Sequence, residues 1–176
     1  MDSYDHIHEY LSKLGMKTME SIIDSYLETS HDKPVMEILD HFLSEELKHK
    51  LSRKTENMLN RSGFPFRKTM DDFDFTFQPS IDRSTMDDLM TMRYKHNNEN
   101  VVFLGPPGVG KTHLSVALGM RAIISDIPVY YVSAMKLVQT LKREYDLNRL
   151  EYRIKTYSRF RLMIVDGIGY LPLSRE

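Results

Sequence analysis

Hydrophobic residues recur at intervals of three and four through the first sixty residues, a pattern typical of amphipathic helices. The first series of apolar positions is Ile7, Tyr10, Leu11, Leu14, Met19, Ile22, Ile23 and Tyr26. The second series is Ile38, Leu39, Phe42, Leu43, Leu47 and Leu51. Residues 30–34 (SHDKP) lie between them as a loop whose proline suits a first helical turn. Because glycine and proline interrupt the pattern at residues 63–65, we predict a small all-helical domain over residues 1–66.

Residues 67–176 have a different pattern, in which short apolar runs alternate with helical stretches. The runs are 101–104 (VVFL), 129–132 (VYYV) and 162–165 (LMIV). Strands that are apolar on both faces are typical of a parallel sheet covered by helices, so this part is predicted to be an α/β domain. Ahead of these runs, Phe73, Phe75 and Phe77 alternate with polar residues and predict an extended segment with one buried face. Ser84 is the expected N-cap of the helix that follows.

The composition is that of a globular protein. Hydrophobic residues make up 41% and charged residues 28% of the 176 residues, and the net charge is -1, which excludes a disordered, collagenous or strongly basic chain. Cysteine is absent, which excludes disulfides and cysteine-ligated metal sites. No apolar run approaches the roughly 18 residues of a membrane span, and the polar start MDSYDHIHEY is unlike a signal peptide. We therefore expect a cytoplasmic protein without a membrane partner.

A phosphate-binding motif directly follows the first apolar run. Residues 105–112 read GPPGVGKT, which is the G-x-x-x-x-G-K-T pattern of a P-loop. Glycines let backbone N–H groups approach phosphates, and the following helix directs its positive end to the same place. Lys111 is expected to reach the β- and γ-phosphates, and Thr112 to ligate Mg²⁺. The predicted ATP-binding residues are Gly105, Pro106, Pro107, Gly108, Val109, Gly110, Lys111, Thr112 and His113.

The third apolar run ends in an aspartate, giving 162–166 (LMIVD) the form of a Walker B strand. Asp166 is expected to hold the magnesium ion and its water shell. We therefore predict Lys111 and Asp166 as catalytic residues, Thr112 and Asp166 as metal-binding residues, and ATP and Mg²⁺ as cofactors. A competing interpretation is the D-x-x-G motif of GTPases at residues 166–169 (DGIG), although no N-K-x-D motif accompanies it.

Three segments together resemble the IstB-like transposition helper ATPases, which are AAA+ proteins related to the helicase loader DnaC. These segments are 73–82 (FDFTFQPSID), 105–119 (GPPGVGKTHLSVALG) and 166–173 (DGIGYLPL), and the similarity extends to 11–16 (LSKLGM). The resemblance implies a P-loop AAA+ core over residues 67–176, ATP-dependent homo-oligomers on double-stranded DNA, and a transposase partner. A DnaC-like loader with a replicative helicase as partner is the alternative, because the nucleotide motifs do not separate the two.

Two departures from the family pattern change the expected activity. Gly167 stands where such ATPases usually carry an acidic residue, typically the glutamate that orients the attacking water, so we predict ATP binding with weak or absent turnover. Glu151 and Glu176 are alternative bases without support from a motif. The chain also ends before the family's further strands, sensor residue and arginine finger. We therefore expect a fragment with exposed sheet edges, and a non-hydrolysing nucleotide-binding remnant is a further alternative.

Two stretches rich in basic residues are candidates for DNA contact. The first contains Lys48, Lys50, Arg53, Lys54, Arg61, Arg67 and Lys68. The second contains Lys142, Arg143, Arg149, Arg153, Lys155, Arg159 and Arg161, interleaved with Tyr145, Tyr152, Tyr157 and Phe160. For the second stretch, an amphipathic helix with a solvated charged face is an equal alternative. The phenylalanines at 73, 75 and 77 are expected in the core, with a place at the adenine pocket as the alternative.

Overall fold

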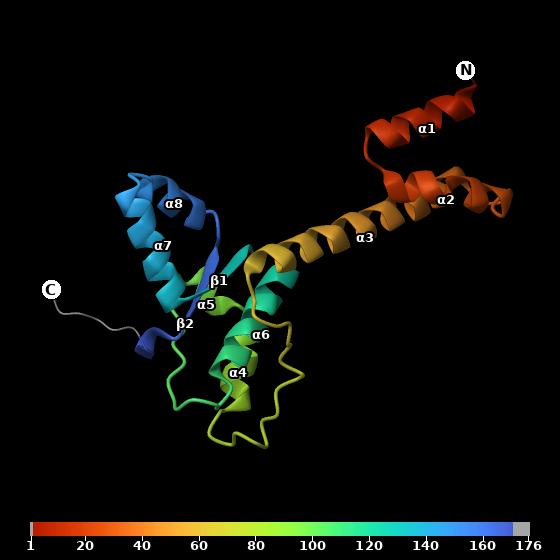
Figure 1. Cartoon of the computed structure of the whole chain (residues 1–176). Helices are drawn as coiled ribbons and strands as arrows, with labels where there is room; N and C mark the ends of the chain where they lie inside the picture. Colours follow the sequence, from red (N-terminus) through yellow and green to blue (C-terminus); the bar gives the residue numbers. More distant parts are fainter. Residues whose placement is uncertain (1, 171–176) are drawn as a thin grey trace. The chain divides into compact units, whose positions relative to one another are not determined.

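The computed structural model describes residues 2–170 and has a mixed α/β architecture (Figure 1). The chain divides into two compact units, Met1–Glu56 and Asn57–Glu176, and the division falls within one long helix. The elements are α1 (Ser3–Lys13), α2 (Lys17–Glu28), α3 (Val35–Ser62), α4 (Arg83–Met90), α5 (Arg93–His96), α6 (Lys111–Ile124), β1 (Val129–Ser133), α7 (Ala134–Asp146), α8 (Leu150–Tyr157), β2 (Leu162–Asp166) and a 3₁₀ turn (Ile168–Tyr170). Within residues 2–170, no helix combines the length and apolar character needed to cross a membrane.

The first unit is helical, as its periodicity predicts. Leu11, Ile23 and Phe42, one from each helix, form its buried core. The Phe42 side chain is the centre of this cluster, because it is 2% exposed and meets the Tyr26 ring edge-on at 5.2 Å. Before α3, the Pro34 carbonyl accepts hydrogen bonds from Glu37 and Ile38, so the proline stands where a helix begins.

A buried carboxylate closes the start of α2. Met16, the N-cap of α2, provides no side-chain cap. Instead, Glu46 reaches across from α3, and its Oε2 accepts hydrogen bonds from the backbone N–H groups of Thr18 at 2.8 Å and Met19 at 3.0 Å. These donors have no partner within their own helix, so Glu46 satisfies them while its negative charge lies at the positive end of α2.

The pKa of Glu46 reflects these contacts. Burial opposes ionisation most strongly, but the N–H groups of Met19 and Thr18 and the ammonium of Lys50 favour the carboxylate, and the pKa lies below its usual range. A carboxyl whose pKa is lowered by folding adds stability above its unfolded pKa. That contribution is lost as the pH falls through the lower folded value.

The second unit contains a parallel pair of strands. β1 pairs with β2 in a register that runs from Val129 opposite Leu162 to Ser133 opposite Asp166. Helix α6 packs against the pair, and its Ala122 and Ile123 are completely buried in one core cluster with Val129. The predicted parallel arrangement of the second and third apolar runs is therefore confirmed.

The first apolar run differs from the prediction. Residues 101–104 form no ladder with another strand in the described part of the chain. Val101 and Phe103 pack against core clusters, whereas Val102 is 71% and Leu104 88% exposed. The run alternates inward and outward like a strand, but without a hydrogen-bonded neighbour it buries one face only.

Two local predictions near residue 80 are also wrong. Residues 73–77 form no strand, and 75–77 are a turn, because the Asp74 side chain accepts hydrogen bonds from the backbone N–H groups of Thr76 and Phe77. Asp82, not Ser84, is the N-cap of α4. Its carboxylate accepts hydrogen bonds from Ser84 and Thr85, and this charged acceptor is stronger than the serine hydroxyl two residues later.

We predict that Glu46→Gln lowers the free energy of unfolding by about 1 to 2 kcal/mol at pH 7, because the neutral amide is a weaker partner for the two N–H groups. Urea unfolding followed by circular dichroism measures this difference. The difference shrinks as the pH falls below the unfolded value of about 4.5 and through the lower folded pKa of Glu46, because the wild type then also loses the charge. Glu45→Gln is the matched control, since the Glu45 carboxylate bonds to the exposed ammonium of Lys48 rather than to the start of α2. A gap that stays constant down to about pH 3 would contradict the role of the charge.

Candidate nucleotide-binding site

The P-loop connects residues 101–104 to α6. Residues 105–108 of the loop are exposed, and Val109–His113 are partly buried. Gly110 is the N-cap of α6 and has no side chain with which to cap it. The first backbone N–H groups of α6 therefore have neither an intrahelical acceptor nor a side-chain cap, which is the arrangement that binds an anion.

The Lys111 side chain folds back onto the P-loop. Its Nζ donates hydrogen bonds to the carbonyl oxygens of Gly105 at 2.8 Å and Pro106 at 2.7 Å. The loop's own carbonyl groups thus hold the ammonium beside the N-terminal end of α6. A positive charge in this position is suited to binding phosphate oxygens.

Asp166 joins the P-loop helix to both strands. Its Oδ2 accepts a hydrogen bond from the Thr112 hydroxyl at 2.8 Å and a second from the Tyr131 hydroxyl at 2.7 Å. Thr112 belongs to α6 and Tyr131 to β1, while Asp166 ends β2. The predicted metal-binding pair, Thr112 and Asp166, is therefore brought together by the fold.

These contacts set the ionisation of Asp166 and Tyr131. Burial opposes ionisation of Asp166 most strongly, but hydrogen bonds from Tyr131 and Thr112, the Gly167 N–H group and the Lys111 charge together lower its pKa. The pKa of Tyr131 is raised, first by burial and then by the bonded carboxylate. At neutral pH Asp166 is thus a carboxylate and Tyr131 a neutral hydroxyl donor.

The residues present suit a magnesium nucleotide. A hydroxyl and a carboxylate are oxygen ligands of the kind that Mg²⁺ prefers, and they lie beside uncapped helix N–H groups and an ammonium. Gly167 has a φ of +74°, and a Cβ added to it would meet nothing within 4 Å. The position that follows Asp166 is therefore open, with no side chain to orient a water molecule.

Aromatic side chains, Phe73 among them, pack against the P-loop. A Cβ on Gly110 would lie 2.5 Å from Cε2 of Phe73, so the ring packs directly on the loop. The same ring lies 5.2 Å from that of His113, whose Nε2 donates to the Thr69 carbonyl at 2.8 Å. Phe73 and Phe75 pack with the buried cluster of α4 and α6, whereas Phe77 is 73% exposed. The core interpretation thus holds for two of the three phenylalanines.

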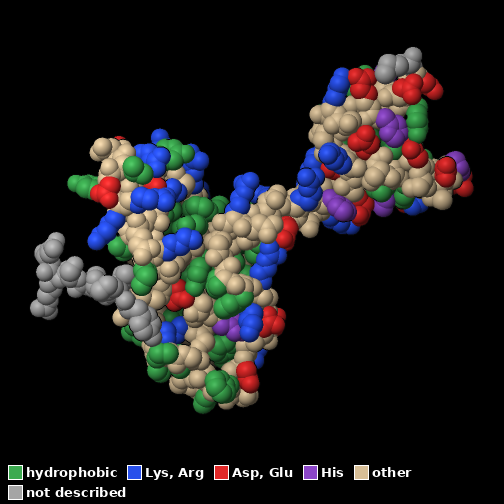
Figure 2. All heavy atoms as spheres, viewed as in Figure 1, with side chains coloured by type: hydrophobic (Ala, Val, Ile, Leu, Met, Phe, Trp, Pro, Cys, Tyr) green, Lys and Arg blue, Asp and Glu red, His purple; other side chains and the backbone are tan. Residues whose placement is uncertain are grey.

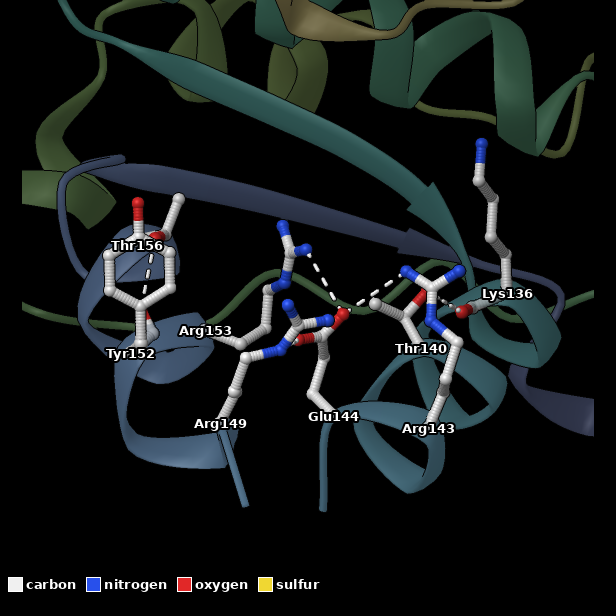
Figure 3. A network of polar contacts seen from close by, with 8 residues as sticks. All are labelled: Lys136, Thr140, Arg143, Glu144, Arg149, Tyr152, Arg153 and Thr156. Carbon is white, nitrogen blue, oxygen red and sulfur yellow. Dashed lines mark hydrogen bonds and ion pairs between the residues drawn. The ribbon is translucent and has the colours of Figure 1, made fainter. Parts of the chain in front are cut away.

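The second basic stretch is organised around a buried acid. Glu144 of α7 has a side chain that is 3% exposed, and its carboxylate lies 3.1 Å from Arg143, 3.2 Å from Arg149 and 3.4 Å from Arg153 (Figure 3). The Arg143 hydrogen bond, followed by the charges of Arg149 and Arg153, lowers the pKa of Glu144 against the effect of burial. Arg153 comes from α8, so this network ties α8 to α7.

Most basic side chains of this stretch remain on the surface. Figure 2 shows lysine and arginine side chains gathered over the α7–α8 part of the molecule, and all seven except the half-buried Arg153 are exposed. Tyr145 and Tyr152 are exposed beside them, whereas Tyr157 and Phe160 stack on Tyr130 at 5.3 and 5.0 Å. Two of the four aromatic residues are thus structural.

The first basic stretch is more dispersed. On α3, Lys48 pairs with Glu45 and Lys50 with Glu46. Beyond the helix, Arg67 donates to the side chain of Asn60 at 2.8 Å, and the Lys68 ammonium lies 5.9 Å from the centre of the Phe66 ring. These contacts are local, and they leave the predicted DNA role of this stretch a prediction.

Comparison with known proteins identifies the family. The model of a family described as "IstB-like ATP binding protein" matches residues 9–176. The chain belongs to this IstB-like family. The family supports ATP over the GTP-binding interpretation of residues 166–169, because its description names ATP.

Three relatives agree with this assignment. The "Insertion sequence IS5376 putative ATP-binding protein" of Geobacillus stearothermophilus is 37% identical over 96% of this chain and 68% of the relative. The IS232 protein with the same description from Bacillus thuringiensis subsp. berliner is 36% identical over 99% of this chain and 71% of the relative. The corresponding IS21 protein of Pseudomonas aeruginosa is 39% identical over 94% of this chain and 63% of the relative.

The IstB-like chain therefore spans about two thirds of the length of these relatives. All three are described as proteins of insertion sequences, which favours that context over a replication helicase loader. Tyr131 and Glu144 were not among the predicted site residues. No local motif marks them, because each acts through a neighbour that only the fold supplies.

We predict that Gly110→Ala lowers the free energy of unfolding by about 2 to 4 kcal/mol, because the new methyl group adds a clash with Phe73 to the cost of a φ of +89°. Gly108→Ala is the control, since its φ is +84° but a Cβ there meets nothing within 4 Å. It should cost about 1 to 2 kcal/mol from the backbone alone. Thermal and urea unfolding compare the two, and equal losses would show that Phe73 does not pack on the loop.

Proposed function

We propose that this IstB-like protein binds ATP with Mg²⁺ at the P-loop and acts as a helper of an insertion-sequence transposase. The nucleotide part of the proposal depends on one observation, the 2.8 Å hydrogen bond from Thr112 Oγ1 to Asp166 Oδ2. These residues are 54 positions apart, and their contact unites the P-loop helix with the Walker B strand. The family description supports ATP as the nucleotide.

Lys111, Thr112 and Asp166 each have a role in this proposal. The N–H groups that begin α6 bind phosphate oxygens, and Lys111 exchanges the carbonyl groups of Gly105 and Pro106 for the β- and γ-phosphates. Thr112 and Asp166 would hold Mg²⁺, which when bound neutralises charge on those phosphates. Tyr131 holds the Asp166 carboxylate in place through its hydroxyl.

We propose weak or absent ATP hydrolysis. An efficient ATPase needs a group that orients the attacking water, and Gly167 offers none at the position after Asp166. Of the alternative bases, Glu151 is exposed on α8, and Glu176 lies outside the described residues. A non-hydrolysing nucleotide-binding remnant is the second candidate function, and the same glycine favours it.

We predict that a fluorescent ATP analogue with Mg²⁺ binds to the wild-type chain and at least about tenfold more weakly to Lys111→Ala, in which the phosphates have no charged partner at this position. Fluorescence anisotropy measures both affinities. Lys155→Ala, which removes an exposed lysine of α8, is the control and should bind as the wild type does. Equal binding by Lys111→Ala and the wild type would refute the proposed site.

Phosphate release from ATP by the same chains tests the turnover part separately. The expected rate for the wild type is close to that of Lys111→Ala. Rapid release that disappears in Lys111→Ala would overturn the proposal of weak hydrolysis and leave the binding site intact.

The proposed partners are double-stranded DNA, a transposase and further copies of the chain assembled with ATP. Support comes from the resemblance to transposition helpers and from the insertion-sequence origin of the relatives. Arg143, exposed on α7, and Arg149, exposed at the N-cap of α8, supply positive charge of the kind that DNA phosphates require. Co-purification with a transposase, as opposed to a replicative helicase, distinguishes this function from that of a helicase loader.

We predict that Arg143→Ala/Arg149→Ala weakens duplex DNA binding and makes the plot of log affinity against log salt concentration less steep, by about 0.9 for each phosphate that the variant no longer neutralises. Anisotropy titrations at several salt concentrations measure the slope. The control is Arg83→Ala/Arg93→Ala. It removes two exposed arginines, from α4 and α5, that pair with Asp87 and Asp88 of α4. An affinity for DNA that does not change with salt would contradict the proposed binding of phosphates.

A further inference from the structure

A tyrosine hydroxyl from β1 reaches the end of β2. Tyr131 pairs with Ile164 in the parallel ladder, and Asp166 lies two residues further along β2. Residues two apart on a strand point to the same face of the sheet, so Asp166 shares the face of Ile164. This face is covered by α6, because the Ile164 side chain packs beside Gly119 (Figure 1). The long Tyr131 side chain spans the offset and places its hydroxyl 2.7 Å from Asp166 Oδ2.

One carboxylate oxygen thus accepts two hydroxyl protons. Oδ2 of Asp166 accepts from Thr112 at 2.8 Å as well as from Tyr131. A hydroxyl has one proton and two lone pairs. Because the Thr112 proton is directed to Oδ2, only lone pairs of its oxygen remain for another partner, and lone pairs on oxygen are what Mg²⁺ binds. The orientation of Thr112 as a metal ligand therefore depends on where Oδ2 lies.

The Tyr131 contact fixes that oxygen independently of Thr112. The terminal torsion of an aspartate side chain is soft, so a carboxylate held by one donor has considerable freedom to rotate. Groups that hydrogen-bond to metal ligands restrict such rotation. The Tyr131 side chain is suited to this task because it is half-buried and its ring meets that of Phe64 edge-on at 6.3 Å.

We propose that Tyr131 is a positioning residue of the magnesium site. Its hydroxyl fixes the Asp166 carboxylate and, through the shared Oδ2, the Thr112 hydroxyl, so that both oxygen ligands are oriented before a metal ion binds. This inference rests on the nucleotide site proposed above. It assigns part of the magnesium dependence of that site to β1, a strand that carries neither the P-loop nor the Walker B aspartate.

The chain offers a matched pair of substitutions for the test. Tyr131→Phe keeps the ring that packs on Phe64 and removes only the donor to Asp166. Tyr130→Phe removes a hydroxyl from the neighbouring residue of β1. The Tyr130 side chain points to the opposite face, where its ring stacks on those of Tyr157 and Phe160.

Titration of Mg²⁺ into the full chain mixed with a fluorescent ATP analogue, followed by anisotropy, measures the effect. Tyr131→Phe raises the Mg²⁺ concentration for half-maximal binding about tenfold, which is the usual cost of removing a partner of a metal ligand. In excess EDTA its affinity for the analogue stays close to that of the wild type. Tyr130→Phe follows the wild type in both conditions, and urea unfolding checks that both variants are folded.

The outcomes separate this inference from the nucleotide site itself. A wild-type chain that binds no analogue, or binds it as Lys111→Ala does, refutes the site and the inference together. A wild type that responds to Mg²⁺ and a Tyr131→Phe variant that responds equally overturn the inference alone. An equal loss of affinity by Tyr131→Phe with Mg²⁺ and in EDTA also overturns it, because the hydroxyl then supports the fold of the loop and not the metal ligands.

Replacing Mg²⁺ with Ca²⁺ tests orientation directly. Mg²⁺ demands nearly ideal ligand geometry, whereas the larger Ca²⁺ accepts flexible arrangements. Tyr131→Phe therefore loses more affinity with Mg²⁺ than with Ca²⁺, and the preference of the site for Mg²⁺ falls. Equal losses with the two cations would show that the hydroxyl does not orient Thr112 and Asp166.

Discussion

In the second unit, the arrangement of the candidate nucleotide site depends on a single carboxylate oxygen. Oδ2 of Asp166 receives hydrogen bonds from Thr112 in α6 and Tyr131 in β1, and Asp166 itself ends β2. A partly buried charge must be compensated, and here two hydroxyl donors compensate it. The hydrogen bonds that satisfy this acid therefore hold the start of the P-loop helix against β1 and the carboxyl end of β2.

The P-loop is constrained from its other side by packing. Phe73 lies so close to Gly110 that no side chain fits between them, and His113 is held by the Thr69 carbonyl. Thr69 and Phe73, which precede the P-loop in the sequence, thus pack against the loop and the start of α6. This explains why the alternating phenylalanines are not a strand. Phe73 and Phe75 fill the space beneath a turn, and the Asp74 hydrogen bonds bend the chain accordingly.

The sequence predicted what local patterns encode. Helical periodicity, the P-loop motif and the Walker B aspartate were each sufficient to place α1–α3, the loop and Asp166. It did not predict Tyr131, Glu46 or Glu144. Tyr131 bonds to Asp166 of the other strand, Glu46 bonds to the start of α2, and Glu144 pairs with Arg153 of α8, so each contact depends on how two elements pack. The run at 101–104 shows the same limit, since an apolar strand pattern does not specify which strand pairs with it. The N-cap of α4 has a different lesson, because Asp82 and Ser84 are both good capping residues and stand two positions apart.

The arginine cluster bears on both alternative interpretations of the second basic stretch. Glu144 is nearly inaccessible and lies against three guanidinium groups, so it has the structural role of joining α7 to α8. One carboxylate neutralises one positive charge, however, and Arg143 and Arg149 stay 68% and 58% exposed. Their side chains are already fixed by the buried acid, so less conformational entropy is lost when they meet a phosphate. The same interaction that stabilises the helix pair therefore also holds two charged groups at its surface, which supports the proposed binding of DNA.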